Sequence, residues 1–245
     1  MPKFFAPECD LREEYITLFG ANADHLRVLR VRAGEELTIS DGQGQEARCV
    51  VESAAKESFR LHVLERRPAA GEATIRAVIY AAFPKGDKAE VIVQKAVELG
   101  ADTIVFFLSS RCISRPEEKA AAAKIERLGK IAEAAAMQSG RGKIPAVRWV
   151  PGFAEMLAEA AKADLSAFLW EEASGCSLRS LMRGKPGFRS AALITGPEGG
   201  FSSEEAAQAN AAGIPAVTLG ARILRCETAP LCALTAVMYE SGNLE

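Results

Sequence analysis

The stretch from Leu193 to Tyr239 reads LITGPEGGFSSEEAAQANAAGIPAVTLGARILRCETAPLCALTAVMY and decides the fold of this chain. Its opening apolar run ends in the loop GPEGGF, residues 196–201, and a helix is predicted to begin at Ser202 or Ser203. A short strand at Ala216–Leu219 leads into a second loop, Gly220–Thr228, and then into a closing helix. Two glycine-bearing loops after consecutive strands predict a pocket of backbone groups at the carboxyl edge of a parallel sheet.

Strands and helices also alternate in the residues that precede this stretch. A helix after Pro84 carries an apolar stripe at helical spacing, and a long helix is predicted to begin at Pro116. This alternation is typical of a parallel sheet with helices on both faces, so the predicted fold class is α/β. The strands are expected at Ile75–Phe83, Thr103–Leu108, Ser166–Trp170 and Ala191–Thr195.

The first 70 residues have a different pattern, with short strands and turns. Glu36–Ser40 and Ala47–Ser53 flank the turn sequence DGQG and predict a hairpin, and Phe59–Leu64 alternates again. Ala23–Val31 predicts a short helix. The proline and glycine of RRPAAG, residues 66–71, indicate a linker. We therefore expect two domains, residues 1–70 and residues 71–245.

Composition narrows the class of protein. At 245 residues, 49% hydrophobic and 25% charged, the chain has the balance of a soluble globular protein. It has no apolar run of membrane-spanning length and no signal-peptide core, so we expect a cytoplasmic protein without a membrane partner. The six cysteines lack CxxC spacing and neighbouring histidines, which indicates free thiols in a reducing compartment and no metal site.

The net charge of −2 hides an uneven distribution along the chain. Residues 111–148 hold nine Lys/Arg and four Asp/Glu, an excess of five positive charges, whereas residues 149–245 hold seven against eleven. A polyanion responds to such local fields more than to the total charge. The basic segment is compatible with RNA binding, and equally with a solvated helix of mixed charge.

Each of the two loops has a plain structural interpretation beside a functional one. GPEGG could be a tight turn, but three glycines around Pro-Glu exceed what a turn needs, and they let backbone groups approach a ligand. The string is neither a Walker loop nor a GxGxxG fingerprint. In the second loop Thr228 is a candidate N-cap, with Pro230 in the first turn of the closing helix. Neither role requires Arg222 and Arg225 beside Glu227.

The motifs GPEGGF and LGxRILRxETA closely resemble the ribosomal RNA small subunit methyltransferase E family, which belongs to the SPOUT class. The resemblance spans nearly the whole chain, through FPKGDK (83–88), QKAVELG (94–100), EAAAMQSGR (133–141) and HLRVLR (25–30). It implies a SPOUT-type parallel sheet with a C-terminal trefoil knot, preceded by a small PUA-like β-barrel. It further implies a homodimer that transfers the methyl group of S-adenosyl-L-methionine (SAM) to N3 of a uridine in small-subunit (16S) rRNA, within ribosome biogenesis.

For such a reaction, the place of each residue in the sequence suggests which residues act. Arg222 and Arg225 would stabilise charge on the uridine, while Glu198 or Glu227 would orient those arginines or accept the proton. Residues expected to bind SAM are Thr195, Gly196, Pro197, Glu198, Gly199, Gly200, Leu219, Gly220, Ile223, Leu224, Thr228 and Ala229. Residues expected to bind RNA are Arg27, Arg30, Lys85, Lys88, Lys95, Arg111, Arg115 and Arg141.

Several alternatives stay open at this level. The chain could methylate another acceptor, such as a ribose 2′-hydroxyl, or could be a non-catalytic RNA-binding protein of ribosome assembly. The two histidines, His25 and His62, are more typical of surface or barrel residues than of a general base. Cys226 stands where the family usually has Thr, which leaves any role for a hydroxyl there open.

Overall fold

The computed structural model describes residues 3–244 and divides them into two compact units. The first unit takes the chain up to Glu72 together with Ala136–Ile144, and the second takes Ala73–Ala135 and the chain from Pro145 onward. A segment from the middle of the chain therefore packs with the amino-terminal unit. The expected domain division after residue 70 stays a prediction.

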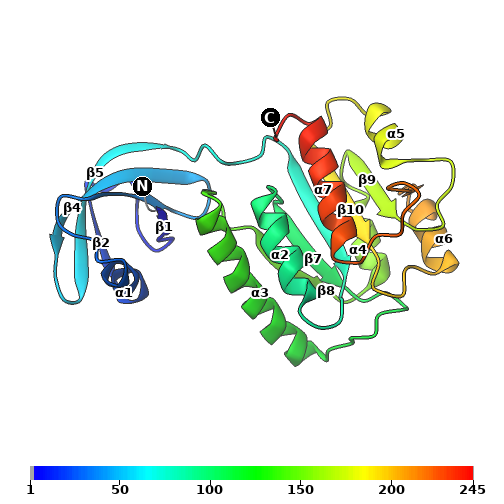
Figure 1. The fold of residues 1–245 in the computed structure, drawn as a ribbon, viewed down its shortest axis with the longest axis horizontal. Coiled ribbons are helices and arrows are strands. Elements are labelled where there is room, and N and C mark those ends of the chain that lie inside the picture. The colour runs from blue at the N-terminus through cyan, green and yellow to red at the C-terminus, as the bar shows by residue number, and fades with distance from the viewer. Residues whose placement is uncertain (1–2, 245) are drawn as a thin grey trace. The chain divides into compact units, whose positions relative to one another are not determined.

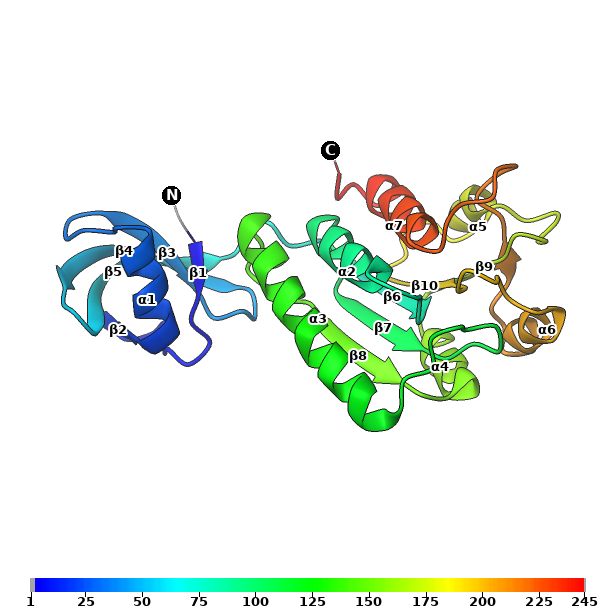
Figure 2. The ribbon, with the colours of Figure 1, turned by 60° about the horizontal axis from the view of Figure 1, so that its bottom comes forward.

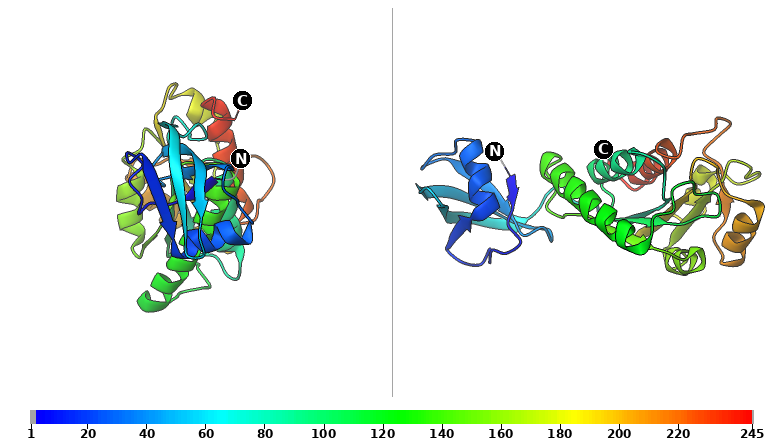
Figure 3. Two further views of the ribbon diagram at one scale, coloured as in Figure 1. Left: turned by 90° about the vertical axis from the view of Figure 1, so that its left-hand side faces the viewer. Right: turned by 90° about the horizontal axis from the view of Figure 1, so that it is seen from below.

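The first unit is a curled five-stranded sheet with one helix (Figures 1 and 3). Its strand order is β1-β3-β4-β5-β2, with β1 parallel to β3 and the other pairs antiparallel. Helix α1 closes a core in which Phe4, Leu26, Leu37 and Phe59 are buried. The elements are β1 (Lys3–Phe5), β2 (Tyr15–Phe19), α1 (Gly20–Val28), β3 (Glu36–Ser40), β4 (Gln45–Ala54) and β5 (Ser58–Pro68).

The returning segment is tied to this sheet by hydrogen bonds to its backbone carbonyl groups. The carbonyl of Gly142 accepts from Ser40 Oγ at 2.9 Å and from the N–H of Gly44 at 3.0 Å. The predicted hairpin is confirmed, but β5 continues through Arg66 and Arg67, where a linker was expected. Both arginines are exposed and pair with residues of β4, so strand pairing extends the regular structure beyond the apolar pattern.

The second unit is built on a six-stranded parallel sheet of order β11-β9-β10-β6-β7-β8. Residues on alternate positions of β6 face opposite layers: Tyr80 packs in a core with Met156 of α4, while α7 and α2 cover the other face (Figure 2). The parallel α/β prediction is therefore confirmed. The elements are β6 (Arg76–Ala82), α2 (Lys88–Glu98), β7 (Thr103–Phe107), α3 (Glu118–Gln138), β8 (Ala146–Val150), α4 (Phe153–Ala160), β9 (Leu165–Leu169), α5 (Leu178–Arg183), β10 (Ser190–Thr195), α6 (Ser203–Ala211), β11 (Ala216–Val217) and α7 (Thr228–Glu240).

Local chemistry explains the helix ends around the two loops. The start of α6 is confirmed, because Ser202 and Glu205 form a reciprocal capping box. The cap assigned to Thr228 is wrong: Thr228 is the first residue of α7, and Glu227 occupies the N-cap without a side-chain bond. The N–H groups of Thr228 and Ala229 both donate to the carbonyl of Arg225, at 2.9 Å each. The helix therefore begins one residue earlier than expected.

Five elements, β1, β2, β8, α4 and α5, were not predicted, and one is shorter than expected. Strand β8 has exposed residues alternating along an edge of the sheet, and its apolar signal is correspondingly weak. Helices α4 and α5 are only eight and six residues long. Strand β11 is reduced to Ala216–Val217, because Thr218 turns away to form a bridge with Ser177.

Candidate active site

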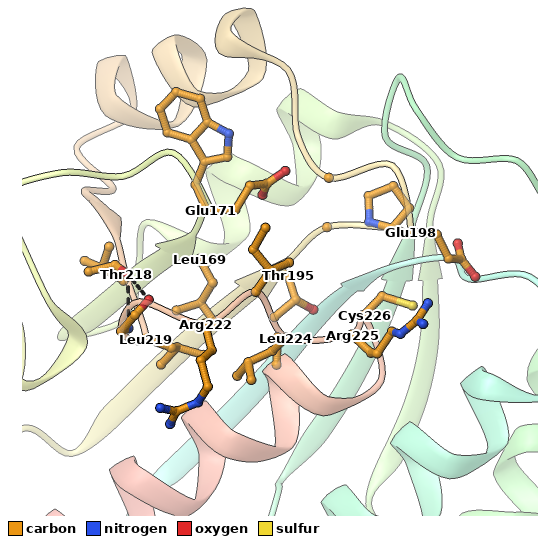
Figure 4. Close-up of a pocket in the computed structure, with 18 of the residues that line it drawn as sticks. Leu169, Glu171, Thr195, Glu198, Thr218, Leu219, Arg222, Leu224, Arg225 and Cys226 are labelled. Carbon is orange, nitrogen blue, oxygen red and sulfur yellow. Dashed lines mark hydrogen bonds between the residues drawn. The ribbon is translucent and has the colours of Figure 1, made fainter.

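A pocket of about 310 Å³ lies where strands β9, β10 and β11 reach their carboxyl ends (Figure 4). Because β9 lies between the other two strands, the loops after β10 and β11 face one another across its end. The two loops predicted from the sequence thus line one cavity. Its lining comprises Leu169, Trp170, Glu171, Thr195, Gly196, Pro197, Glu198, Gly200, Val217, Thr218, Leu219, Gly220, Ala221, Arg222, Ile223, Leu224, Arg225, Cys226 and Ala229.

The second loop leaves a run of backbone groups without protein partners. The hydroxyl of Thr218 donates to the carbonyl of Gly220 and accepts from its N–H, both at 3.1 Å, and so fixes the start of the loop (Figure 4). From Ala221 to Leu224, no N–H or C=O group is hydrogen-bonded to any residue between positions 3 and 244. Such a free edge beside a cavity can bind the polar edge of a planar ligand.

The first loop contributes its shape through Gly200. Its N–H bonds to the carbonyl of Pro197 at 3.0 Å, and its φ of +66° lies in the left-handed region that favours glycine. A Cβ at this position would overlap the carboxylate of Glu171. Glu171 itself has no ion pair and no hydrogen bond within the described part of the chain, so its charge is available to a ligand.

Two residues predicted to bind the cofactor do not line this cavity. A Cβ on Gly199 would meet Cβ of Arg111 at 3.2 Å, so this glycine faces the loop after β7. Thr228 lies in the first turn of α7 and is also absent from the pocket wall. Conversely, sequence reasoning missed the end of β9, which contributes Leu169, Trp170 and Glu171. Only the order of strands in the sheet could have identified them.

Glu198 is held away from the cavity centre. Its Oε1 accepts from Lys88 Nζ at 2.7 Å and from the backbone N–H of Lys85 at 3.0 Å. Figure 4 shows the carboxylate turned away from Thr195 and Leu224. Burial acts to raise the pKa of Glu198, but the Lys88 ammonium and the N–H donors outweigh it and lower the pKa. Glu198 thus links the loops after β6 and β10.

Arg222 and Arg225 both line the pocket, and both have unpaired guanidinium groups. Within residues 3–244 neither guanidinium has an ion pair or hydrogen bond. Figure 4 shows the two guanidinium groups at opposite ends of the loop, with Arg225 beside Cys226. They are therefore available for different parts of a bound substrate.

Cys226 has the environment of an inert thiol. Burial, together with the hydrogen bond of 3.2 Å between its Sγ and Glu227, raises its pKa to about 12. The thiol is therefore protonated at neutral pH and donates to Glu227. This occupies one of the two carboxylates proposed from the sequence to accept a proton.

Half of the basic residues that were expected to bind RNA gather at the same sheet edge as the pocket. Lys85 and Lys88 follow β6, and Arg111 and Arg115 follow β7, the next two strands beyond β10. Arg111 donates to the carbonyl of Gly199 at 3.1 Å, which joins this basic loop to GPEGG. Lys95 instead pairs with Glu98 at the carboxyl end of α2.

Arg141 is an exception and corrects the sequence-based assignment. It is only 4% exposed and pairs with Glu72 at 2.8 Å. Glu72 also accepts from the N–H groups of Gly142 and Lys143, so this ion pair anchors the returning segment inside the first unit. A guanidinium buried in this way is unsuited to an RNA phosphate.

The remaining predicted residues lie on the first unit. Arg27 is exposed and pairs with Asp24 at 2.7 Å, while Arg30 is exposed with a φ of 58°. His25 packs edge-on against Phe4, and His62 stacks on Tyr15. Within the residues that the structure describes, no three His, Cys, Asp or Glu side chains form a group suited to a metal ion. Over the same residues, no helix is long and apolar enough to span a membrane.

Two family models assign the parallel α/β unit with this pocket, and the curled β unit before it, to a class of RNA methyltransferase. The family model described as "RNA methyltransferase domain" matches residues 71–238, and the model "RNA methyltransferase PUA domain" matches residues 20–64. Within this class, the ribosomal RNA small subunit methyltransferase E of Bacillus subtilis is 33% identical over 233 residues, covering 93% of this chain and 91% of the relative. The chain belongs to the ribosomal RNA small subunit methyltransferase E family.

Solved structures agree with this assignment. The crystal structure of a ribosomal RNA small subunit methyltransferase E from Neisseria gonorrhoeae bound to S-adenosyl methionine has a TM-score of 0.84 and 32% identity, covering 98% of this chain and 97% of that one. A methyltransferase from Legionella pneumophila in complex with SAM has a TM-score of 0.84 and 28% identity, covering 97% and 96%. The expected SPOUT-type fold with a PUA-like unit is confirmed, whereas the knot stays a prediction.

Proposed function

We propose that this protein methylates N3 of a uridine in small-subunit (16S) rRNA, with SAM as the methyl donor. The free backbone edge at Ala221–Leu224, facing GPEGG in a chain of this family, carries the proposal. The Bacillus subtilis relative is named for small-subunit rRNA methylation, and the Neisseria gonorrhoeae relative is described as bound to SAM. Ribosome biogenesis in the cytoplasm is the corresponding setting.

The pocket has the chemistry that SAM requires. Its volume of about 310 Å³ lies at the small end of cofactor sites, and Leu169, Leu219 and Leu224 supply apolar walls for an adenine ring. The carboxylate of Glu171 is a partner for the positive charge of the cofactor. The buried indole Nε1 of Trp170, at the wall, has no hydrogen-bond partner among the described residues. The other proposed binding residues are Thr195, Gly196, Pro197, Gly200, Gly220, Ile223 and Ala229.

The protein's part in the chemistry is alignment and charge stabilisation. Bound SAM supplies an electrophilic methyl group, so the proposal assigns no metal. Holding uridine N3 in line with the donor provides a large part of the rate enhancement. As N3 loses its proton, negative charge spreads to O2 and O4, and a guanidinium from Arg222 or Arg225 stabilises it. Glu198 is a positioning residue, since Lys88 already neutralises it.

RNA contacts follow from the arrangement of cations. Lys85, Arg111 and Arg115 lie on loops at the same sheet edge as the pocket, where they would hold phosphates beside the flipped-out uridine. We further propose that residues 1–70 form a PUA-like RNA-binding domain, with Arg27 and Arg30 exposed on it, and that residues 71–245 form the methyltransferase domain.

A homodimer is proposed from apolar surface near the pocket. Helix α7 buries Leu234, Val237 and Met238 within its own unit, yet Tyr239 on the same helix remains 69% exposed. Ile223 in the pocket loop is 85% exposed. A second copy of the chain would cover such side chains. Light scattering at micromolar concentration should give twice the mass of the chain, and a monomer mass would contradict the proposal.

Two measurements test the reaction itself. Mass spectrometry of nucleosides from small-subunit rRNA should show N3-methyluridine in the parent strain and its loss in a deletion strain. Purified protein with labelled SAM should restore the modification to the rRNA of the deletion strain. Loss of a 2′-O-methylated nucleoside would instead assign another acceptor, and unchanged nucleosides would indicate a binding protein.

A further inference from the structure

A second cavity, of about 410 Å³, lies on the sheet face covered by α4. It shares no lining residue with the first pocket. Arg76 and Ser190, which begin β6 and β10, line it, whereas Thr195 at the end of β10 lines the first pocket. The two cavities thus lie toward opposite ends of the strands. Nothing in the methyl-transfer reaction uses the second one.

Positive side chains dominate the wall of this cavity. Arg76, Arg148 and Lys162 line it, with Glu159 as the only carboxylate in the lining. Arg148 pairs with Glu159 at 2.7 Å, and Arg76 pairs with Asp102 outside the wall at 3.1 Å. Lys162 has no ion pair within residues 3–244 and is exposed. The lining therefore carries an uncompensated cation.

Tyr80 contributes an unsatisfied hydroxyl to the same cavity. The residue is 4% exposed, and its hydroxyl makes no hydrogen bond to any part of the chain that the structure describes. Burial raises the pKa of Tyr80, and the charged groups around its hydroxyl are those of Glu159, Arg148 and Arg76. The hydroxyl lies at the cavity wall without a protein partner among the described residues, so its donor is available to a ligand.

We propose that this cavity binds the phosphoryl group of a phosphate ester. Phosphate oxygens accept strong hydrogen bonds from ammonium, guanidinium and hydroxyl donors, which Lys162, Arg148 and Tyr80 present together. The cavity is larger than a phosphate group, and Val78, Ala191 and Ala192 form an apolar floor for a small organic body. The ester is either a free metabolite-sized phosphate or a phosphate of the RNA chain.

Calorimetry with ribose 5-phosphate, and with ribose as the unphosphorylated control, tests the free ester. Ribose 5-phosphate should bind and ribose should not. Lys162→Ala and Tyr80→Phe should each weaken binding about tenfold, since each removes one bond to a charged group. Tyr80→Phe keeps the ring and therefore the packing. Lys130→Ala is the matched control, because this lysine is 73% exposed and lies on α3.

A parallel titration with a single-stranded oligoribonucleotide tests the RNA source. If ribose 5-phosphate fails to bind, but both cavity variants weaken oligoribonucleotide binding relative to Lys130→Ala, the phosphoryl group belongs to RNA. Ribose 5-phosphate binding that is unaffected by either variant would overturn the proposal. So would the absence of any effect in both titrations. None of these readouts requires methyl transfer, so a failure here is distinguishable from a failure of the proposed reaction.

Discussion

Replacing Gly200 by alanine should weaken SAM binding, with a modest loss of stability of the fold. An alanine there carries a left-handed backbone, at a cost of about 1–2 kcal/mol in stability. Its Cβ would also overlap the Glu171 carboxylate, which must then rotate away. Loss of one bond to a charged ligand group costs about 1.5–3 kcal/mol, so SAM affinity should fall roughly tenfold to a hundredfold.

The chain offers a matched control for this experiment. Gly213 has a φ of +78°, and a Cβ added there meets no atom within 4 Å. Gly213→Ala therefore carries the same backbone cost without any collision. Calorimetric titration with SAM and thermal unfolding should show similar melting temperatures for the two variants, but weak SAM binding only for Gly200→Ala.

A double-mutant cycle tests whether Gly200 acts on SAM binding through Glu171. Glu171→Ala should itself weaken SAM binding, and adding it to Gly200→Ala should cause little further loss, because both changes remove the same contact. Equal SAM affinity in Gly200→Ala and Gly213→Ala would refute the reasoning. Fully additive losses in the cycle would show that Gly200 acts without Glu171.

Three further predictions concern the two loops and their neighbours. At least one of Arg222→Ala and Arg225→Ala should keep SAM and RNA binding while its rate of single-turnover methylation falls about a hundred- to a thousandfold. Near-normal rates in both variants would exclude a catalytic role for these arginines. Neutralising Arg111 and Arg115 together should lower the salt slope of RNA binding by about 1.4, and an unchanged slope would mean that these arginines do not contact phosphates. Cys226, whose pKa is about 12, should resist alkylation by iodoacetamide at pH 8, while the exposed Cys232 on α7 should react. Rapid alkylation of Cys226 would contradict the conclusion that its thiol is inert.

Local sequence was sufficient wherever the determining interactions are local. The capping box of Ser202 lies within four residues, and α6 begins as predicted. The strand at Glu36–Ser40 was predicted with its observed limits, and β10 begins only one residue before its predicted start. The apolar runs of the parallel strands identify buried segments, because such strands are covered on both faces.

The sequence by itself therefore determined the α/β class, the curled amino-terminal unit and the two loops that form the pocket. Only the tertiary structure decided that β9 lies between β10 and β11, which brings Glu171 to the cavity and against Gly200. It also turned Glu198 toward Lys88 and buried Arg141 on Glu72. These outcomes depend on pairs of residues that lie between 29 positions apart (Glu171 and Gly200) and 110 positions apart (Lys88 and Glu198). Strand order and the partners of a charged side chain leave no trace in local periodicity.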